Sequence, residues 1–382
     1  MKFTTWTSTV RAPTSYDIRA QSNNTFVAMA LDQNRASVEQ RLYNLFANYD
    51  NYSLFSNEGW IPQNNDGNGS YDSLESVHDT IHNIAGGFSG HMSYIPFSAF
   101  DPIFFLHHAN VDRLFAMWQT LYPASWILPT PAAMNSYTTS RGQIQDSSTA
   151  LTPFFADEDG NFWTSDMVRD HTVFGYTYAD VLSPGKEQQA SNSSNVAKVI
   201  NRLYGQSSAA RFALGVNNTG KGSRGRTNAF SGSKYREWIA NLRVEKQALG
   251  GPFVIHLFLG DAPGDTRTWS HAPNLFGVMS VFASPSGGGM AMSAEQMVSG
   301  TVPLTAKLVE EMTRKALPTL EIYDVVPFLK QNLQYRIQLP DGTEVQKVNS
   351  LVIEVVSHAV QAPLTELELP RWGVADINFR LV

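Results

Sequence analysis

The sequence has 382 residues, of which 42% are hydrophobic and 16% charged, a composition typical of a globular protein with two or three domains. The net charge is −6, so no basic surplus is present to neutralise phosphates, and we expect no nucleic-acid partner. Cysteine is absent, which excludes disulfides, iron–sulfur clusters and cysteine nucleophiles.

The start of the chain, MKFTTWTSTVRAP, lacks the apolar stretch of a signal peptide. The sequence also lacks a run of about 18 apolar residues, which a membrane-spanning helix requires. We therefore expect a cytoplasmic protein with no membrane partner.

Three helices are predicted in the first third of the chain, over residues 36–47, 74–84 and 102–121. Each has apolar residues at helical spacing. The second helix follows Ser73 and the third follows Asp101, and both residues are favourable N-caps.

The rest of the chain changes character twice. Residues 184–232 are rich in Gly, Ser and Asn, which predicts a linker, and Lys221–Arg226 is a basic stretch suited to protease cleavage. From residue 233 onward, short β-rich runs separated by turns predict a β-sandwich or barrel with one helix at 305–316. The expected fold is thus multidomain, α then β, with a helical part at 1–183 and a β-rich part at 233–382.

Five of the nine histidines lie between positions 78 and 108. His78 and His82 are four residues apart, so both rings lie on one face of the predicted helix. This pair alone leaves a metal site and a solvated helix face open as interpretations. The segment HDTIH also resembles the zinc-protease pattern HExxH, but Asp79 replaces the general-base Glu, which weakens the hypothesis of a zinc hydrolase.

His107 and His108 are adjacent on the third helix and point about 100° apart, so only one of them can join a shared metal. They follow the apolar run Ile103–Leu106, where a histidine without a partner would leave polar nitrogens buried. Three neutral imidazoles favour copper or zinc. The other histidines are scattered, and His256, in an apolar strand, is interpreted as a satisfied core or edge residue.

The extended sequence around these histidines is specific. HDTIHNIAGGFSGHM at 78–92 and FDPIFFLHHANVDRLFAMWQ at 100–119 resemble the second copper-binding motif of tyrosinases, catechol oxidases and molluscan haemocyanins. FGYTYAD at 174–180 resembles the motif that closes the copper domain of fungal tyrosinases, and the segments 235–261 and 324–345 resemble their C-terminal domain. The resemblance to fungal tyrosinases covers nearly the whole chain.

This resemblance implies a partial helical bundle of the type-3 copper family, followed by a β-sandwich-like or barrel-like C-terminal domain. In the family, two coppers, each held by three histidines, bind dioxygen, hydroxylate monophenols and oxidise o-diphenols to o-quinones, as in pigment (melanin) formation. The implied copper ligands here are His78, His82 and His108, and the implied partners are phenols and dioxygen. In latent fungal members, the C-terminal domain covers the copper site with an inserted side chain, and cleavage in the linker activates the enzyme.

The resemblance also implies roles for three further residues. Glu75, three residues before the first ligand, would hold a water that helps to deprotonate the phenol. Asp79 occupies a position that is often Asn in strong monophenolases, so oxidation of diphenols without hydroxylation is also open. Phe104 would line the substrate pocket, although an ordinary core phenylalanine fits the sequence equally well.

The first copper motif of the family has no counterpart here, because no histidine precedes position 78. We therefore expect a chain that begins inside the family's copper domain, possesses one three-histidine site, and exposes apolar helix faces that favour instability or self-association as a homo-oligomer. The alternatives are a truncated, inactive copper-binding relative and a mononuclear zinc or copper protein.

Overall fold

The computed structural model describes residues 6–60, 69–133, 135–181, 189–205, 234–284 and 296–382. The proposed cleavage stretch at 221–226 lies outside these residues, as does most of the expected linker. Within the linker, the described part is helical, since α7 spans Gln189–Leu203. The boundaries expected after residues 183 and 232 stay predictions.

The first part of the chain is helical. Its elements are α1 (Asn24–Asn48), α2 (Tyr52–Ser56), α3 (Leu74–Gly86), the 3₁₀ turn η2 (His91–Ser93), α4 (Ile95–Ser98) and α5 (Ile103–Leu121). All three predicted helices are present. The first is longer than expected, because it begins twelve residues earlier, where the side chain of Asn23 caps the backbone N–H of Phe26.

The two helices that carry the histidine motifs begin and end at residues that are typical of helix termini. The Ser73 side chain accepts a hydrogen bond from the N–H of Ser76 at the start of α3, and Gly87, at φ 54°, ends the helix in a conformation that favours glycine. Asp101 accepts a hydrogen bond from the N–H of Ile103 at the start of α5. These signals fix the positions of the histidines along both helices.

An aromatic core holds α1, α2, α3, α5 and α7 together. Trp118 on α5 is fully buried, stacks on Phe55 of α2 with 4.6 Å between ring centroids, and donates its indole N–H to the carbonyl of Tyr49. A buried ion pair adds a polar layer: Arg41 of α1 contacts Asp72 at 2.6 Å, just before α3. This packing places the first halves of α3 and α5 side by side.

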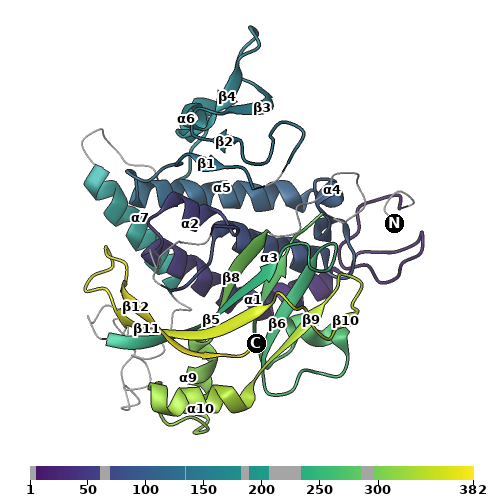
Figure 1. Ribbon diagram of the computed structural model, residues 1–382, viewed down its shortest axis with the longest axis vertical. Coiled ribbons are helices and arrows are strands. Elements are labelled where there is room, and N and C mark those ends of the chain that lie inside the picture. Colours follow the sequence, from purple (N-terminus) through teal and green to yellow (C-terminus); the bar gives the residue numbers. More distant parts are fainter. Residues whose placement is uncertain (1–5, 61–68, 134, 182–188, 206–233, 285–295) are drawn as a thin grey trace.

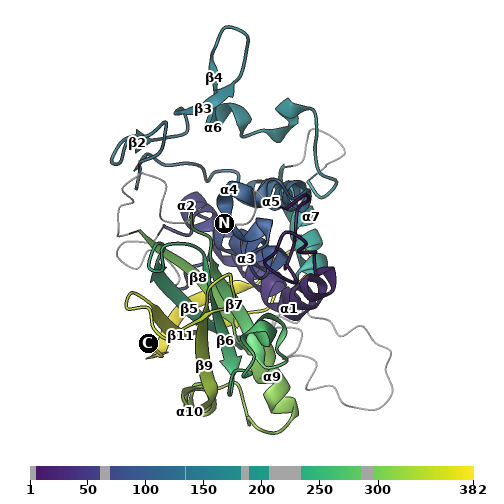
Figure 2. The same cartoon turned by 90° about the vertical axis from the view of Figure 1, so that its right-hand side faces the viewer.

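Two small hairpins project from this helical layer (Figure 1). They consist of β1 (Thr130–Pro131) with β2 (Ile144–Gln145) and β3 (Ala150–Phe155) with β4 (Phe162–Thr164), followed by α6 (Ser165–Val168) and the 3₁₀ turn η3 (His171–Phe174). They extend away from the sheets of the second part of the chain (Figures 1 and 2).

The second part of the chain is a sandwich of two four-stranded sheets, ordered β10-β9-β6-β7 and β12-β11-β5-β8. The strands are β5 (Lys234–Glu245), β6 (Phe253–Leu259), β7 (Leu275–Val281), β8 (Met297–Pro303), β9 (Leu333–Gln338), β10 (Glu344–Val345), β11 (Val352–Gln361) and β12 (Arg371–Arg380). Every pairing within these sheets is antiparallel. Of the two expected architectures, the sandwich is present, and neither described sheet closes into a barrel.

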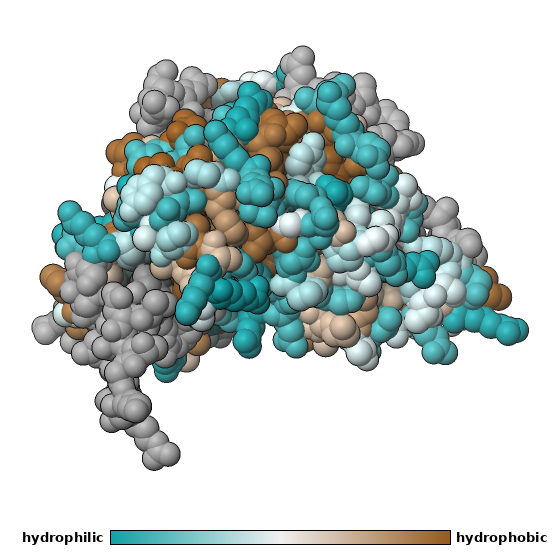
Figure 3. Space-filling model, turned by 90° about the horizontal axis from the view of Figure 1, so that it is seen from below, coloured by the Kyte–Doolittle hydropathy of each residue, from teal (hydrophilic) through white to brown (hydrophobic). Residues whose placement is uncertain are grey.

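Alternation along the strands explains how this sandwich packs. On β5, Trp238, Ala240, Leu242 and Val244 point into the core between the sheets, as Phe253, Ile255 and Leu257 do on β6. Helices α9 (Thr305–Thr313) and α10 (Ile322–Asn332) cover the end farthest from α5 (Figure 1), and the 3₁₀ turn η6 (Thr266–His271) precedes β7. Seen from the β half, hydrophilic residues surround separate apolar patches (Figure 3).

The outer faces of the sandwich pack on α1 and α3, so the two halves share one interface. Polar contacts cross this interface: Thr301 of β8 donates to Asp72 at 2.6 Å, and Asn241 of β5 donates to the carbonyl of Gly69 at 2.6 Å. None of the described helices combines the length and the apolar character that a membrane span requires.

Candidate metal centre

Two helices bring the histidines together. On α3, the residues Glu75, His78, Asp79 and His82 follow the spacing of one helical stripe, and this stripe faces the start of α5. His107 and His108 lie one turn into α5, opposite that stripe. The sequence therefore predicted correctly that the two motifs meet in space.

Three Nε2 atoms converge on one point between the helices. Nε2 of His108 lies 3.3 Å from Nε2 of His78 and 3.2 Å from Nε2 of His82. For a tetrahedral metal with nitrogen ligands at about 2.0–2.1 Å, neighbouring ligand atoms are about 3.3 Å apart. The two measured distances are thus close to the ligand spacing of such a metal ion.

His107 is a second candidate for the third ligand position. Ring nitrogens of His78, His82 and His107 all lie within 4.8 Å of one another. The His107 ring stacks on that of His78 with 5.0 Å between centroids, and its buried Nε2 has no partner among the described residues. This group contains His107 and not His108, whereas the 3.2–3.3 Å distances bring His108 close to both histidines of α3. The assignment of His108 as the third ligand stays a prediction, with His107 as the alternative.

The remaining ring nitrogens of the α3 pair are held by oxygen atoms. Nδ1 of His78 lies 2.9 Å from Oδ1 of Asp79, and Nδ1 of His82 lies 3.1 Å from the carbonyl oxygen of Met92. Metal-binding histidines commonly donate their second N–H to a carboxylate or carbonyl, which leaves the other nitrogen free for the metal. The arrangement orients both Nε2 lone pairs toward the shared point.

The imidazoles are neutral near pH 7. Burial, helped by the neighbouring imidazoles, lowers the pKa of His82 and of His107 to about 3 and that of His108 to about 4. Burial also lowers the pKa of His78, against the opposing effect of Glu75. A cluster of neutral imidazoles is the donor set that copper and zinc prefer, so these residues fit the copper that the tyrosinase resemblance implies.

A group of carboxyls lies behind His78. Glu58, in the loop after α2, is only 1% exposed and pairs with Lys246 of the β half at 2.8 Å between Oε1 and Nζ. Glu75 accepts a hydrogen bond from the N–H of Glu58 at 3.0 Å. Burial raises the pKa of Asp79 and that of Glu58 well above their usual range, with further contributions from Glu75 on Asp79 and from Asp79 on Glu58.

Two phenylalanines border the histidines. Phe104 stacks on His108 with 4.0 Å between centroids, which places this residue beside the cluster, as both interpretations of the sequence allowed. Phe282, directly after β7, stacks on His82 at 4.4 Å, and its N–H donates to Oδ2 of Asp79 at 3.3 Å. Phe282 is 7% exposed, so the β half covers one side of the cluster.

The sequence did not point to Glu58, Lys246 or Phe282. None of them belongs to a histidine motif. Lys246 and Phe282 reach the cluster through the packing of the β half on α3, and Glu58 reaches it from the loop after α2. Glu58 is a polar residue in a segment without helical or strand periodicity, so its proximity to the histidines cannot be predicted from the sequence.

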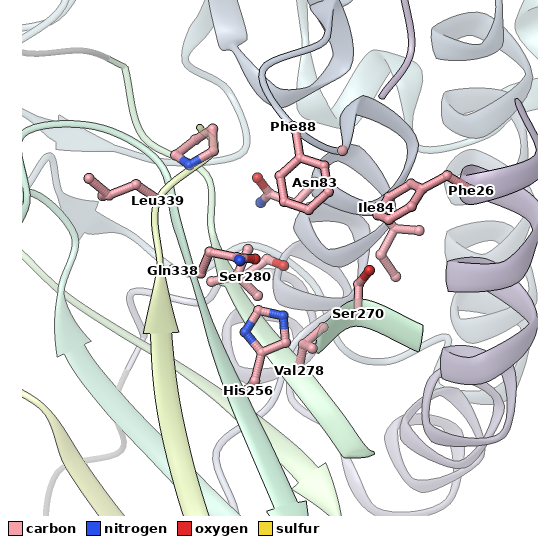
Figure 4. Close-up of a pocket in the computed structure, with 13 residues that line it drawn as sticks. Phe26, Asn83, Ile84, Phe88, His256, Ser270, Val278, Ser280, Gln338 and Leu339 are labelled. Atoms are coloured by element: carbon pink, nitrogen blue, oxygen red, sulfur yellow. The ribbon is translucent and has the colours of Figure 1, made fainter. Parts of the chain in front are cut away.

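A separate pocket lies between the two halves (Figure 4), and none of the four clustered histidines is among its lining residues. It is lined by Phe26 of α1, Asn83 of α3 and Phe88 in the turn after α3, and from the sheet by His256 and Ser280. His256 is 1% exposed, a core position as expected, and its Nδ1 has no hydrogen-bond partner among the described residues, so whether this nitrogen is satisfied stays a prediction.

Two family models match the chain. The common central domain of tyrosinase matches residues 3–121, and the tyrosinase C-terminal domain matches residues 237–355. The first range contains the entire histidine cluster, and the second contains Lys246 and Phe282.

Curated relatives agree with these matches. A tyrosinase of Neurospora crassa is 29% identical over 96% of this chain and 66% of the relative, and one of Podospora anserina is 31% identical over 81% and 61%. The chain thus spans slightly less than two thirds of the length of these relatives.

Solved structures extend the likeness to three dimensions. A mushroom tyrosinase in latent and active forms aligns with a TM-score of 0.76 at 26% identity, covering 96% of this chain and 64% of that one. An Aspergillus protyrosinase aligns with a TM-score of 0.63 at 21% identity, covering 97% and 60%, which shows a common fold.

Proposed function

Because the chain belongs to the fungal tyrosinase family, we propose that its three-histidine cluster binds copper and that the complete protein oxidises phenols with dioxygen. The observation that carries this proposal is the approach of Nε2 of His108 on α5 to within 3.3 Å of Nε2 of His78 and 3.2 Å of Nε2 of His82 on α3, all from neutral imidazoles. The proposed reactions are the hydroxylation of monophenols and the oxidation of o-diphenols to o-quinones.

Copper, when bound, supplies the electron transfer between the phenol and dioxygen, and the chain supplies the surroundings. Glu75 is the proposed acceptor of the phenol proton through a water, because its carboxylate stands one turn before His78 on the same stripe of α3. Asp79 holds His78 in the tautomer that frees Nε2, and Phe104 forms an aromatic wall beside His108.

The β half is proposed to keep the site latent. The ring of Phe282 lies on His82, so a phenol ring cannot reach the same face of that imidazole. This fits a mushroom relative whose latent and active forms have both been solved. Cleavage at 221–226 would then allow the β half to move away from the histidines.

We also propose a cytoplasmic location for the protein.

A second candidate rests on the histidine count. Among all nine histidines, which the described residues include, a single group could hold a metal. This favours a chain that binds one copper and does not turn over phenols alone, with activity belonging to the complete protein. Two apolar residues of α5 are exposed, Phe105 at 63% and Leu106 at 74%. They would be covered in the complete protein or by a second copy of this chain.

The test begins by loading the purified chain with copper, counting the metal, and assaying o-quinone formation from an o-diphenol. We expect one copper per chain, lost in His78→Ala, His82→Ala and His108→Ala and kept in the control His171→Ala, which lies outside the cluster. The variant His107→Ala distinguishes the two candidates for the third ligand.

Quinone formation would assign the activity to this chain, whereas one copper without quinone would support the second candidate. A chain that binds no copper, or one whose copper survives all three ligand substitutions, would contradict the proposed site.

A further inference from the structure

The group of carboxyls behind His78 is paired with a cation of the β half. Lys246, directly after β5, extends its ammonium to Glu58 at 2.8 Å and to Glu75 at 3.9 Å. Its side chain is 17% exposed, so this ion pair is largely shielded from solvent. Burial lowers the pKa of Lys246, but Glu58 and Glu75 outweigh that effect and raise it, so the lysine remains charged.

Glu58 is held by the β half at two points. Besides the ion pair with Lys246, its carbonyl oxygen accepts the N–H of Ser299 at 2.9 Å and the Ser299 hydroxyl at 3.1 Å. Ser299 belongs to β8 and Lys246 directly follows β5, so two separate segments of the β half contact the same loop residue of the helical half. Glu58 therefore takes its position from the sandwich more than from its own loop.

Glu75 is in turn oriented by these two residues. Its Oε2 accepts the N–H of Glu58 at 3.0 Å, and its Oε1 faces the ammonium of Lys246 at 3.9 Å. One oxygen thus contacts the backbone of Glu58, and the other faces the lysine of the β half. Because the Glu75 side chain is still 40% exposed, this orientation is not imposed by burial and needs these two contacts.

We propose that Glu58 and Lys246 are positioning residues for Glu75, through which the β half directs the carboxylate that accepts the phenol proton. The inference rests on the proposed function for the chemical role of Glu75, while the positioning itself rests on the contacts. The β half then acts on the site in two separable ways: Phe282 covers His82, and Lys246 with Glu58 directs Glu75.

A purely structural ion pair would have different consequences. If Lys246 only fastened the two halves together, its loss would weaken the interface without a specific change at Glu75. The variant Lys246→Met keeps most of the apolar stem and removes the charge, and Lys246→Arg restores the charge at the same site. Comparing the two variants separates positioning from general packing.

The first measurement needs no metal. Carboxyl groups of the full chain are labelled with a carbodiimide and an amine, and labelling of each Asp and Glu is read by mass spectrometry. In Lys246→Met we expect several-fold faster labelling of Glu75, with Lys246→Arg close to the unaltered chain. The exposed Asp157 serves as an internal control that should not change.

Unchanged labelling of Glu75 in a folded Lys246→Met variant would overturn the positioning role. So would equal acceleration at every carboxyl near the interface, because that indicates general loosening. The melting temperature of each variant, measured in parallel, establishes that the protein is folded.

The second measurement uses the copper-loaded chain and compares monophenol with o-diphenol turnover. Lys246→Met should lower the ratio of monophenol to diphenol rates several-fold at unchanged copper content, and Lys246→Arg should recover it. An unchanged ratio in an active protein would count against the inference. If the unaltered chain does not turn over either substrate, the result contradicts the proposed activity of this chain. The labelling experiment then tests the positioning role alone.

The pocket of Figure 4 carries an independent inference. Three polar atoms at this pocket, Nδ1 of His256 and the hydroxyls of Ser270 and Ser280, are buried and have no hydrogen-bond partner among the described residues. The side chains face Phe26 and Phe88 across the interface between the halves (Figure 4). Buried polar groups in folded proteins are nearly always paired, with protein or with ordered water.

The size of the pocket decides between possible occupants. Its volume is about 40 Å³, whereas a cavity that holds a benzene ring measures about 150 Å³ and one water needs roughly 10–15 Å³. We infer that this site binds a cluster of about two or three ordered waters, and no phenol, between α3 and the sheet.

A high-resolution crystal structure of the full chain tests this inference. We expect density for waters within hydrogen-bond distance of His256 Nδ1 and the Ser280 hydroxyl, and loss of the water next to residue 280 in Ser280→Ala. A pocket without density, or one filled by an organic molecule, would overturn it.

Discussion

Asp79 offers the most direct test of how the helical half prepares a metal site. Its Oδ1 lies 2.9 Å from Nδ1 of His78, and it is 2% exposed, so solvent cannot replace it as the hydrogen-bond acceptor. Removal of such a partner from a metal-binding histidine typically reduces metal affinity about 10- to 100-fold, or about 1.4–2.7 kcal/mol. We expect a loss in this range for Asp79→Ala.

The pH dependence of binding follows from the same contact. Burial and Glu75 raise the pKa of Asp79 well above its usual range, so at low pH the carboxyl keeps a proton that the hydrogen bond from His78 must displace. Copper affinity should therefore increase as the pH rises toward that pKa and level off above it. Asp79→Asn retains an acceptor oxygen but does not titrate, so it should lose less affinity than Asp79→Ala and lack this pH-dependent rise.

The assay is a competitive copper titration of the three proteins at several pH values, with a chelator of known affinity. Circular dichroism establishes that each variant is folded. An affinity of Asp79→Ala within about threefold of the unaltered chain would refute the reasoning, because the hydrogen bond to Nδ1 would then contribute nothing to the orientation of His78.

Three further outcomes are expected. Burial raises the pKa of Glu237 in the folded protein to about 8, so as the pH rises the unfolded state loses this proton first. The free energy of unfolding should therefore fall between about pH 4.5 and pH 8. In urea unfolding, Glu237→Gln should lack this fall and have a free energy of unfolding about 3 kcal/mol higher near pH 7. Arg41→Met should lose about 3–5 kcal/mol in the same assay, because it leaves Asp72 buried without its partner. Phe282→Ala should make His82 several-fold more reactive toward an imidazole-modifying reagent, as read by mass spectrometry, because the covering ring is removed.

The helices that carry the site were predictable from sequence because their signals are local. Ser73 caps α3, Asp101 receives the first N–H of α5, and the spacing of His78 and His82 places both on one face. These features depend on residues within one or two turns. The choice between His107 and His108 does not, because it depends on how α5 rotates against α3.

Elements without a local signal were missed for physical reasons. Strand β8 is rich in small and polar residues, and a Cβ on its Gly300 would lie 2.4 Å from the Ser76 hydroxyl, so close packing on α3 explains the glycine. Strand β12 is an edge strand without a buried residue, so it lacks the nearly continuous apolar runs that marked β6 and β7. Both strands were stabilised by partners distant in sequence.

Phe282 and Asp79 connect the β half to the histidine cluster. The ring of Phe282 lies on His82, while its backbone N–H donates to Oδ2 of Asp79, whose other oxygen holds His78. A side-chain substitution removes the ring but keeps the N–H, so Phe282→Ala should open the site and leave copper affinity nearly unchanged. Asp79→Ala should do the reverse, weakening the metal while the ring still covers His82.

Movement of the whole β half differs from either substitution, because it removes the ring, the N–H on Asp79 and Lys246 at once. In the intact chain, exposure of His82 and loss of the contacts to Asp79 and Glu75 would therefore occur together. Measuring copper affinity and His82 reactivity on both variants tests this separation. If Phe282→Ala weakened copper as much as Asp79→Ala, the ring itself would support the histidines, and the β half would be part of the metal site as well as its cover.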